Sequence, residues 1–449
     1  MPAPGLSNQK SEDAAMTEHS TFTGREGTPA DKEALTEAVR LLRKPATIRE
    51  RCRNIATAVA AGRSPHFALD RTKLPDVARR VARLTQERFP GGQVPLHSRW
   101  RQLEAGGVDR KALMDARCAA LSPSDLARAR IDLAVVSVLL DADAGPDWSY
   151  TEPGTNRRYS RGEGLAVASF HAFMGGAFST DMRTPMRVDA AGLERVDAAQ
   201  LTRLLQVSDT NPLVGLEGRA LLLQRLGTAL RKRPDVFGDP GRPGRLFDLL
   251  CNPLVGGAGS TVQRIAVKRI SAPQILRALL KGFGGIWPGG QLLMGKPVGD
   301  TWPHPEAGGE GPSAGRVPFH HLSQWLSYSL VEPFQWAGIE VEGLDELTGL
   351  PEHRHGGLLI DAGVIVPRDP MYGTRTFTAA DPWVIEWRAL TVTLLDEVAR
   401  LVRAELGQPR LSLAAVLEGG TAAAGRQIAG ERRPGGPPPV RVASNGTIF

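Results

Sequence analysis

Carboxylates in unusual positions are the residues of this sequence best suited to chemistry. Asp132 lies inside a strongly apolar segment, Glu332 lies near the end of PFHHLSQWLSYSLVEP, and Glu352 stands close to Arg354 in LTGLPEHRHGGLLIDAGVI. A carboxylate at a polar cavity can act as a general acid or base. Glu352, Asp132 and Glu332 are therefore the first residues to consider for a functional site.

Asp132 also has an ordinary structural explanation. It follows Arg128 by four residues, a spacing at which opposite charges pair on a helix. Asp141 and Asp143 follow the end of the same segment, where the helix dipole disfavours negative charge and water would solvate them. The sequence leaves both an Arg128–Asp132 ion pair and a carboxylate at a substrate cavity open.

Polar residues recur at spacings of three, four and four in the segment that contains Glu332. They are His321, Gln324, Tyr328 and Glu332, whereas Leu322, Trp325, Leu326 and Leu330 can face a core. On a helix these polar residues share one face. The pattern predicts either hydrogen-bonding groups for a polar ligand or a solvent-facing surface.

The segment around Glu352 has the composition of a binding loop. Gly356 and Gly357 follow Arg354 and permit close backbone approach. His353 and His355 suggest a metal, but neither a cysteine nor a further histidine stands at ligand spacing. We therefore predict no metal site.

A glycine-rich stretch near the carboxyl end offers a second kind of chemistry. LEGGTAAAGR places Gly419, Gly420, Thr421 and Arg426 at a possible helix start, where backbone amides and a guanidinium can hold a phosphate. Glu418 opposes an anion there, and glycine-rich helix starts are common. Phosphate binding is thus one of two interpretations of this stretch.

The elements that must position these residues are mainly helices. From Lys32 onward, apolar residues mostly recur three and four apart, which is typical of helices. Ser122 can cap a helix that starts at Pro123, with Asp125 completing a capping box, and this helix continues to about Leu140. Its apolar residues occupy most sides, so we expect it to be central.

A second well-marked helix begins at Asp381-Pro382 and runs to Gly407, with Pro409 two residues beyond. It carries Glu386 and Arg388 beside Trp387, and these charges either line the site or pair with other helices. We predict a mainly α fold over residues 34–449, a single large helical domain with a few minor short strands such as 440–443.

Composition bounds the function further. Hydrophobic residues make up 41% of the 449 residues and charged residues 23%, and no apolar stretch approaches the roughly 20 residues that span a bilayer. Three distant cysteines and the lack of a secretory signal predict a cytoplasmic protein. The net charge is +7, but the basic residues are interspersed with acidic ones, and only four tyrosines are present. A nucleic-acid partner is therefore not expected.

The first 33 residues contain mostly acidic charges among Ser, Thr, Gly and Ala, and we predict a disordered tail there. The sequence has no G-x-x-x-x-G-K-[ST], H-E-x-x-H or G-x-S-x-G motif and no Rossmann fingerprint after a credible strand. We therefore expect no cofactor. The sequence does not determine the oligomeric state.

Ten separated strings resemble one family from about Leu35 to Phe449. They are LRKPATIRERCRNI, GRSPHF, HSRWRQLEAGGVDR, RIDLAVVSVLLDADAGPDW, GEGLAVASF, NPLVGLEGR, LTGLPEHRHGG, IEWRALTV, LEGGT and SNGTIF. The sequence is similar to the uracil-catabolism family of fungi and bacteria, long classed as a domain of unknown function. It departs from the family pattern at Ala422, His353, His355 and Asn445, so the histidines are not expected to be shared ligands.

The order FHHLSQWLSYSLVEP, GLDELTGLPEHRHGGLLIDAGVI, VIEWRALTVTLLDEV also resembles the queuosine-salvage nucleoside glycosylases. That resemblance implies an all-helical N-ribosyl hydrolase in which Glu352 and Arg354 match the family motif. A carboxylate is expected near Ser329, and Glu332, Asp132 or Asp300 are its possible substitutes here. Such chemistry suits a carboxylate beside an oxocarbenium-like transition state.

These resemblances lead to one functional hypothesis and its alternatives. We expect hydrolysis of the N-ribosyl bond of a uracil-derived intermediate, such as ribosylurea or its phosphate, in a polar central cavity. Glu352 would position the ribose or water, and Asp132 or Glu332 would be the general base. The remaining substrate-binding candidates are Arg354, Tyr328, Gln324, His321, Glu386, Arg388, Asp300, Arg99, Thr421 and Arg426. Of these, Arg99, Arg354, Arg388 or Arg426 could hold a 5′-phosphate. The alternatives are a non-catalytic partner or uracil-nucleotide-binding protein and a different hydrolase or deaminase of the same route.

Overall fold

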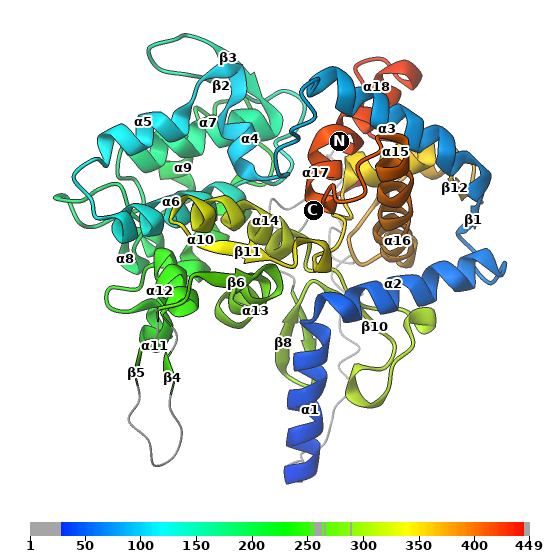
Figure 1. Ribbon diagram of the computed structural model, residues 1–449, viewed down its shortest axis with the longest axis horizontal. Helices are drawn as coiled ribbons and strands as arrows, with labels where there is room; N and C mark the ends of the chain where they lie inside the picture. Colours follow the sequence, from blue (N-terminus) through cyan, green and yellow to red (C-terminus); the bar gives the residue numbers. More distant parts are fainter. Residues whose placement is uncertain (1–27, 253, 256–262, 265, 288–289, 444–449) are drawn as a thin grey trace, which may run out of the picture.

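Helices form most of the computed structural model, which describes residues 28–252, 254–255, 263–264, 266–287 and 290–443 (Figure 1). The helices are α1 (Pro29–Leu42), α2 (Pro45–Ala60), α3 (Leu74–Arg88), α4 (Arg99–Leu103), α5 (Arg110–Arg117), α6 (Pro123–Leu139), α7 (Arg161–Met174), α8 (Ala190–Glu194), α9 (Ala198–Leu204), α10 (Leu216–Arg231), α11 (Pro234–Phe237), α12 (Leu246–Cys251), α13 (Ala272–Phe283), α14 (His321–Trp336), α15 (His353–Asp361), α16 (Pro382–Glu405), α17 (Leu413–Val416) and α18 (Ala422–Arg432). The predicted mainly α fold is confirmed.

Strands are short, and each described strand pairs with one other. The antiparallel pairs are β1 (Phe67–Leu69) with β12 (Ile365–Pro367), β2 (Ser149–Thr151) with β3 (Arg158–Ser160), β4 (Leu254–Val255) with β5 (Gln263–Arg264), β7 (Gln291–Leu293) with β8 (Lys296–Gly299), and β9 (Thr301–Pro303) with β10 (Arg316–Pro318). The parallel pairs are β6 (Arg269–Ser271) with β11 (Glu340–Glu342), and β13 (Thr376–Phe377) with β14 (Arg441–Val442). These pairs tie loops together without forming a layer.

Helix α6 lies inside the molecule, as its sequence predicts. Ser122 caps it by accepting the backbone N–H of Asp125 at 3.1 Å. The Asp125 carboxylate accepts the Ser122 hydroxyl at 2.7 Å, so this end is held by a side-chain pair and not by a complete capping box. Residues from Ile131 to Leu139 are all buried, because α7, α12 and α14 pack around α6.

Helices α14 and α16 carry most of the candidate residues. α16 packs on α2, α3 and α15 and is buried along most of its 24 residues. α14 packs on α6 and α13 and buries ten consecutive residues from Leu322 to Val331. The segment before α15 contacts α14 through Thr348, and α15 packs on α16 (Figure 1).

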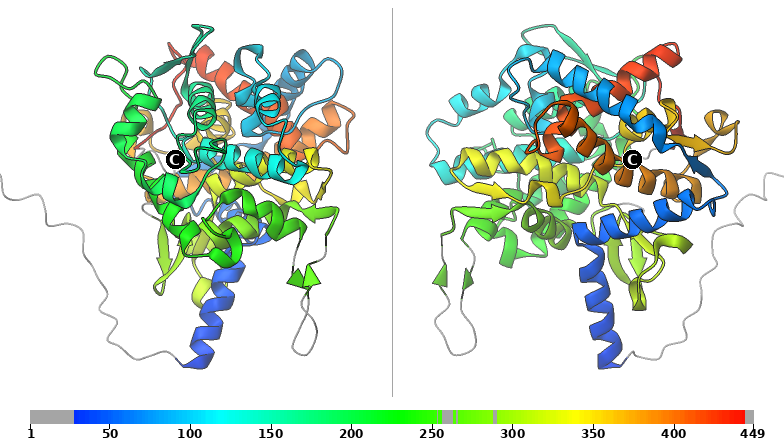
Figure 2. Two further views of the ribbon diagram at one scale, coloured as in Figure 1. Left: turned by 90° about the vertical axis from the view of Figure 1, so that its left-hand side faces the viewer. Right: turned by 45° about the vertical axis from the view of Figure 1, so that its right-hand side comes forward.

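The amino-terminal boundary differs slightly from the expected one. Residues 1–27 of the expected tail lie outside the described residues, whereas Pro29 to Glu33 form the first turns of α1. Thr28 and Asp31 form a capping box that starts this helix, and α1 projects from the remaining described chain (Figure 2). In the described part of the chain, every helix is too short or too polar to cross a membrane.

Candidate functional site

Glu352 is the amino-terminal cap of α15 and the centre of the polar cluster. Its two carboxylate oxygens accept the backbone N–H groups of Arg354 at 3.0 Å and His355 at 3.1 Å. Burial opposes ionisation, but the His355 ring, the Arg354 guanidinium and these N–H groups hold the Glu352 pKa at about 2. Glu352 is therefore a fixed negative charge at neutral pH and cannot donate a proton there.

Cationic and imidazole groups surround this carboxylate. Arg354 and His321 both lie within electrostatic reach of Glu352 and favour its charged form. Burial lowers the pKa of His353, while the charges of Glu352 and Asp143 oppose that change. Burial therefore favours the neutral form of the His353 ring, and the carboxylates of Glu352 and Asp143 both lie within electrostatic reach of it.

His355 fixes the turn that carries Glu352. Its ring Nδ1 lies 2.9 Å from the Leu350 carbonyl oxygen, and its Nε2 lies 3.0 Å from the Thr421 hydroxyl. Burial lowers the pKa of this fully enclosed histidine, while the nearby charge of Glu352 opposes that change. Its two ring contacts bridge α15 to the carboxyl-terminal helices. Of our candidates, Thr421 therefore acts on Glu352 through His355.

Close backbone approach is required at Gly356, as the sequence predicts. A Cβ atom at this position would lie 2.5 Å from the ring of Trp387. Because that ring is buried in α16 and cannot move aside, only glycine allows α15 to reach α16. The space at Gly357 is less restricted, because a Cβ there would lie 3.0 Å from the ring of Pro439.

Gln324 and Tyr328 support the Glu352 turn from α14. The Gln324 amide accepts the Thr348 backbone N–H at 2.9 Å and donates to its hydroxyl at 2.6 Å. The Tyr328 hydroxyl donates to the Thr348 carbonyl at 3.0 Å. Both side chains are buried, so the solvent-facing alternative is wrong for them, and they position the loop rather than present groups to a ligand.

Asp300 and Arg388 form a buried ion pair behind His321. The two guanidinium Nη atoms of Arg388 donate to Asp300 at 2.8 and 2.7 Å, and Asp300 also accepts the His321 backbone N–H at 3.0 Å. Burial opposes ionisation, but Arg388 and these donors hold the Asp300 pKa far below its ordinary value. The pair anchors the start of α14, so it supports the cluster from behind.

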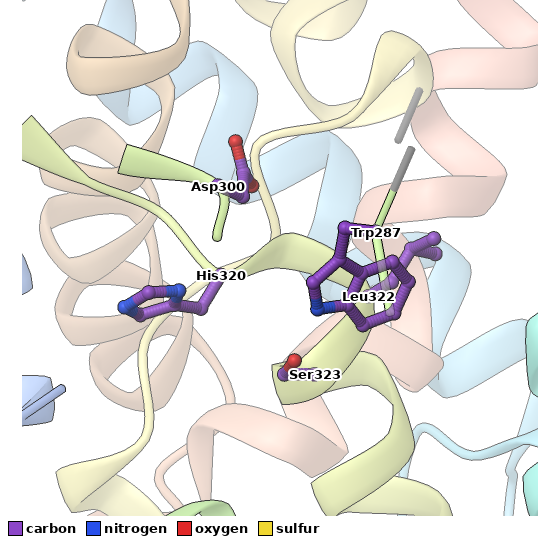
Figure 3. Close-up of a pocket in the computed structure, with 5 residues that line it drawn as sticks. All are labelled: Trp287, Asp300, His320, Leu322 and Ser323. Carbon is purple, nitrogen blue, oxygen red and sulfur yellow. The ribbon is translucent and has the colours of Figure 1, made fainter. Parts of the chain in front are cut away.

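A small hollow lies beside this ion pair. Figure 3 shows Asp300, His320 and Trp287 around it, with Leu322 and Ser323 of α14 completing the lining. Its volume is about 10 Å³, close to the minimum of roughly 10–15 Å³ that one water molecule needs. It is too small for a pentose, and it is not the central cavity that the sequence predicts between α6, the Glu352 loop and α16.

A second arm of the cluster comes from the segment before and within α4. Arg99 is fully buried and pairs with Asp141 at 2.7 Å, and Asp141 accepts the Trp325 indole N–H at 3.1 Å. The Trp325 ring lies 4.6 Å from the ring of His97, which lies 6.1 Å from that of His355. This chain of contacts connects Arg99 to the Glu352 turn.

Sequence reasoning missed His97 and Trp325 and left Asp141 as a solvated carboxylate. In the structure Asp141 is paired instead, and Trp325 contributes its indole N–H to that pairing. The available signal was membership in HSRWRQL, LLDADAG and SQWLSYS, which are among the strings that carry the two family resemblances. Spacing alone does not reveal them, because they are far apart in sequence.

Glu332 supports the α4 arm from its far side. It accepts the Ser98 hydroxyl and the Arg101 guanidinium, the latter at 2.8 Å. Burial raises its pKa, and the nearby Glu418 charge raises it further. Glu332 therefore holds the residues that flank Arg99, and it shares no hydrogen-bond partner with Glu352 in the described chain.

Asp132 lies apart from the cluster. It accepts the Arg242 guanidinium at 2.6 Å, the Gly244 N–H at 2.6 Å and the Val188 N–H at 3.2 Å. The Arg128–Asp132 pair considered from sequence is wrong, because Arg128 pairs with Asp248 at 2.7 Å. Burial raises the Asp132 pKa, and its contacts join α6 to the loops before α8 and α12.

Glu386 is also separate from the Glu352 turn. It accepts the Ser64 hydroxyl, which in turn accepts the backbone N–H groups of His66 and Phe67, both at 2.9 Å. His304 lies 3.6 Å from the other carboxylate oxygen. Glu386 therefore organises the turn before β1, and these loop contacts differ from the pairing with another helix that the sequence suggests.

The glycine-rich stretch does not begin a helix. Leu417–Thr421 form the π-helical turn η8 between α17 and α18, and a Cβ at Gly420 would lie 2.4 Å from the Val81 carbonyl of α3. A Cβ at Gly419 would likewise lie 2.8 Å from the side chain of Thr85 in α3. These glycines serve helix packing, so the phosphate-loop interpretation is wrong for their amides.

Arg426 follows this stretch and belongs to the cluster. Partial burial lowers its pKa, and the positive charge of Arg354 lowers it further. The carboxylates of Glu163 and Glu352 act in the opposite direction.

Across the described residues, no group of three or more His, Cys, Asp or Glu side chains is arranged to hold a metal ion.

Comparison with known proteins agrees with the family resemblance. Residues 41–449 match the model of a family described as "Protein of unknown function (DUF1688)". "Uracil catabolism protein 4" of Lachancea kluyveri is 37% identical over 417 residues, covering 86% of this chain and 93% of the relative. "Protein urg3" of Schizosaccharomyces pombe is 34% identical over 425 residues, covering 92% of this chain and 100% of the relative.

Proposed function

The chain belongs to the family described as "Protein of unknown function (DUF1688)", and on that premise we propose a role in uracil catabolism. The name of the Lachancea kluyveri relative supports this role. The proposed location is the cytoplasm, supported by three cysteines that are free thiols in the structure.

The proposed activity is hydrolysis of an N-ribosyl bond in a uracil-derived intermediate, such as ribosylurea or its phosphate. The observation that carries it is the permanently charged Glu352 at the head of α15, with Arg354, His321 and His353 around it. The similarity of the α14, α15 and α16 segments to queuosine-salvage glycosylases adds support. An oxocarbenium-like transition state develops positive charge on the sugar, which a fixed carboxylate stabilises.

The reaction breaks the bond between C1′ and the departing nitrogen, which leaves with the electron pair. The oxygen of water bonds to C1′ and keeps one hydrogen, and the other proton of that water passes to the departing nitrogen. The carboxylate oxygens of Glu352 have lone pairs that the backbone N–H groups of Arg354 and His355 do not use. With these lone pairs Glu352 accepts hydrogen bonds from the ribose hydroxyls or from the attacking water. Because attack occurs on a cation that is already formed, a strongly basic residue is not needed.

Asp132 and Glu332 are weaker choices for the general base than the sequence suggests. Asp132 is fully buried against Arg242 and two backbone amides, and Glu332 is held by Ser98 and Arg101. We propose instead that His353 accepts the proton, since burial lowers its pKa and so favours the unprotonated ring.

Purified protein should be incubated with ribosylurea, its 5′-phosphate, uridine and uridine monophosphate, and free pentose should be followed. The proposal expects pentose release from a ribosylurea, and loss of that release in Glu352→Gln. Release from none of these compounds would reject the N-ribosyl hydrolase.

The second candidate is a non-catalytic protein that binds a uracil nucleotide or a pathway partner. The observation that favours it is that both oxygens of Glu352 already accept backbone N–H groups. Ligand binding without turnover, undiminished in Glu352→Gln, would support this candidate over the hydrolase.

A further inference from the structure

Arg354 and Arg426 project from two helices that meet at backbone contact. A Cβ atom at Gly425 would lie 2.3 Å from the carbonyl oxygen of Arg354, so α18 can approach α15 only because residue 425 is glycine. Arg426 is the next residue along α18. The two guanidinium groups therefore emerge from adjoining positions on the two helices.

Neither guanidinium is neutralised by a direct contact. In residues 28–443, apart from the short undescribed gaps, the side chains of Arg354 and Arg426 form no hydrogen bond or ion pair. The Nη1 atom of Arg354 is buried without a hydrogen-bond partner. Leaving a buried charged donor unpaired costs free energy, so this atom indicates a missing acceptor.

The charges nearby do not supply that acceptor. The carboxylate of Glu418 already pairs with Arg88 at 3.1 Å, and the carboxylate of Asp141 already pairs with Arg99 at 2.7 Å. Glu352 directs its oxygens to backbone N–H groups of α15. Glu163 acts on Arg426 only at a distance and is exposed.

We propose that Arg354 and Arg426 form an anion subsite that binds the phosphate of a ribosyl phosphate substrate. Two guanidinium groups present paired N–H donors that match phosphate oxygens, and a doubly charged group balances two cations. Arg354 lies two residues from Glu352, so an anchored phosphate places the sugar beside the carboxylate. This inference rests on the proposed function and specifies its substrate class as phosphorylated.

The first test measures binding without turnover. Ribose 5-phosphate, ribose and inorganic phosphate are titrated into the full chain and into Arg426→Met, which alters an exposed residue. Arg432→Met, an exposed arginine on the same helix, is the matched control. We expect ribose 5-phosphate to bind at least about tenfold more tightly than ribose, and only Arg426→Met to abolish this preference.

Equal binding of ribose and ribose 5-phosphate by the unaltered chain would overturn the subsite. The same conclusion follows if Arg426→Met and Arg432→Met weaken binding equally. Arg354→Lys provides a second variant that keeps the charge but removes the paired donors, and it should lose most of the phosphate preference.

The second test separates this inference from the proposed reaction. With ribosylurea phosphate as substrate, Arg426→Met should raise KM about tenfold or more, whereas the control Arg432→Met should leave KM unchanged. Equal KM values for ribosylurea and ribosylurea phosphate would reject the subsite but leave the hydrolase proposal in place. Arginine-dependent binding of ribose 5-phosphate without any hydrolysis rejects the hydrolase while the subsite stands.

Discussion

The carboxylate of Glu352 accepts the backbone N–H of His355 at 3.1 Å, and the ring of that histidine lies 3.0 Å from the Thr421 hydroxyl. One buried residue therefore fixes the carboxylate and joins it to the carboxyl-terminal helices. The arrangement explains how a charged group is held rigidly in the interior.

Replacing Glu352 with Gln should reduce kcat for pentose release by at least about 100-fold, because the transition state loses a fixed negative charge. Gln has the same shape and can still cap α15, so the fold should survive. Steady-state kinetics on wild type, Glu352→Gln and the exposed control Glu405→Gln measure the effect. Equal losses in both variants would refute a specific role for Glu352.

Glu352 and Glu332 should give stability changes of opposite sign as pH is varied. The Glu352 pKa is about 2, below its ordinary 4.5, so its stabilisation is present above about pH 4.5 and is lost as pH falls towards 2. The Glu332 pKa is raised by burial, so its ionisation costs stability as pH rises above 4.5.

Urea unfolding of wild type, Glu352→Gln and Glu332→Gln between about pH 3 and pH 7 tests this contrast. With rising pH, Glu352→Gln should lose stability relative to wild type, whereas Glu332→Gln should gain it. Parallel curves for the two variants would show that the two carboxylates do not differ in environment as described.

Thr421→Val should destabilise the protein by about 1–3 kcal/mol, because the buried Nε2 of His355 loses its hydrogen-bond partner. Thr421→Ser keeps the hydroxyl and should lose less. The difference in the free energy of unfolding between the Val and Ser variants isolates the hydrogen bond. If the two are equally stable, the Thr421 hydroxyl does not support His355.

Asp132→Asn should lower the free energy of unfolding by about 3 kcal/mol, because it breaks a buried ion pair with Arg242. The kcat of the remaining folded protein should be unchanged, since Asp132 contacts none of the groups around Glu352. Denaturation and kinetics on the same samples separate the two effects. A fall in kcat with no loss of stability would restore Asp132 as a general base.

The sequence predicts the helices well because their signals are local. Ser122 and Pro123 mark the start of α6, and Asp381 and Gly407 bound α16, each within one turn of the observed ends. Burial on every side of α6 also follows from its own apolar residues. Such features depend on near neighbours in the chain, so one sequence suffices to find them.

The ion pairs could not be predicted in the same way. Helical spacing favours Arg128 as the partner of Asp132, yet tertiary packing brings Arg242 to it from 110 residues away. Asp300 likewise finds Arg388 88 residues later. A polar residue in an apolar segment shows that a partner is required but does not identify it.

Glycines illustrate a second limit. Gly356 and Gly420 both lie in glycine pairs near charged residues, and in both places the missing Cβ allows a neighbouring helix to approach. The sequence suggests a phosphate loop at Gly420 because phosphate loops and close helix packing both select glycine. Only the position of Val81 on α3 distinguishes the two.

The role of Glu352 in N-ribosyl hydrolysis is tested by following the release of free pentose from ribosylurea phosphate by wild type and Glu352→Gln. We expect steady release by wild type and at least about a 100-fold lower rate for the variant. Wild-type protein that binds the compound but releases no pentose, or a variant that releases it at the wild-type rate, would contradict it.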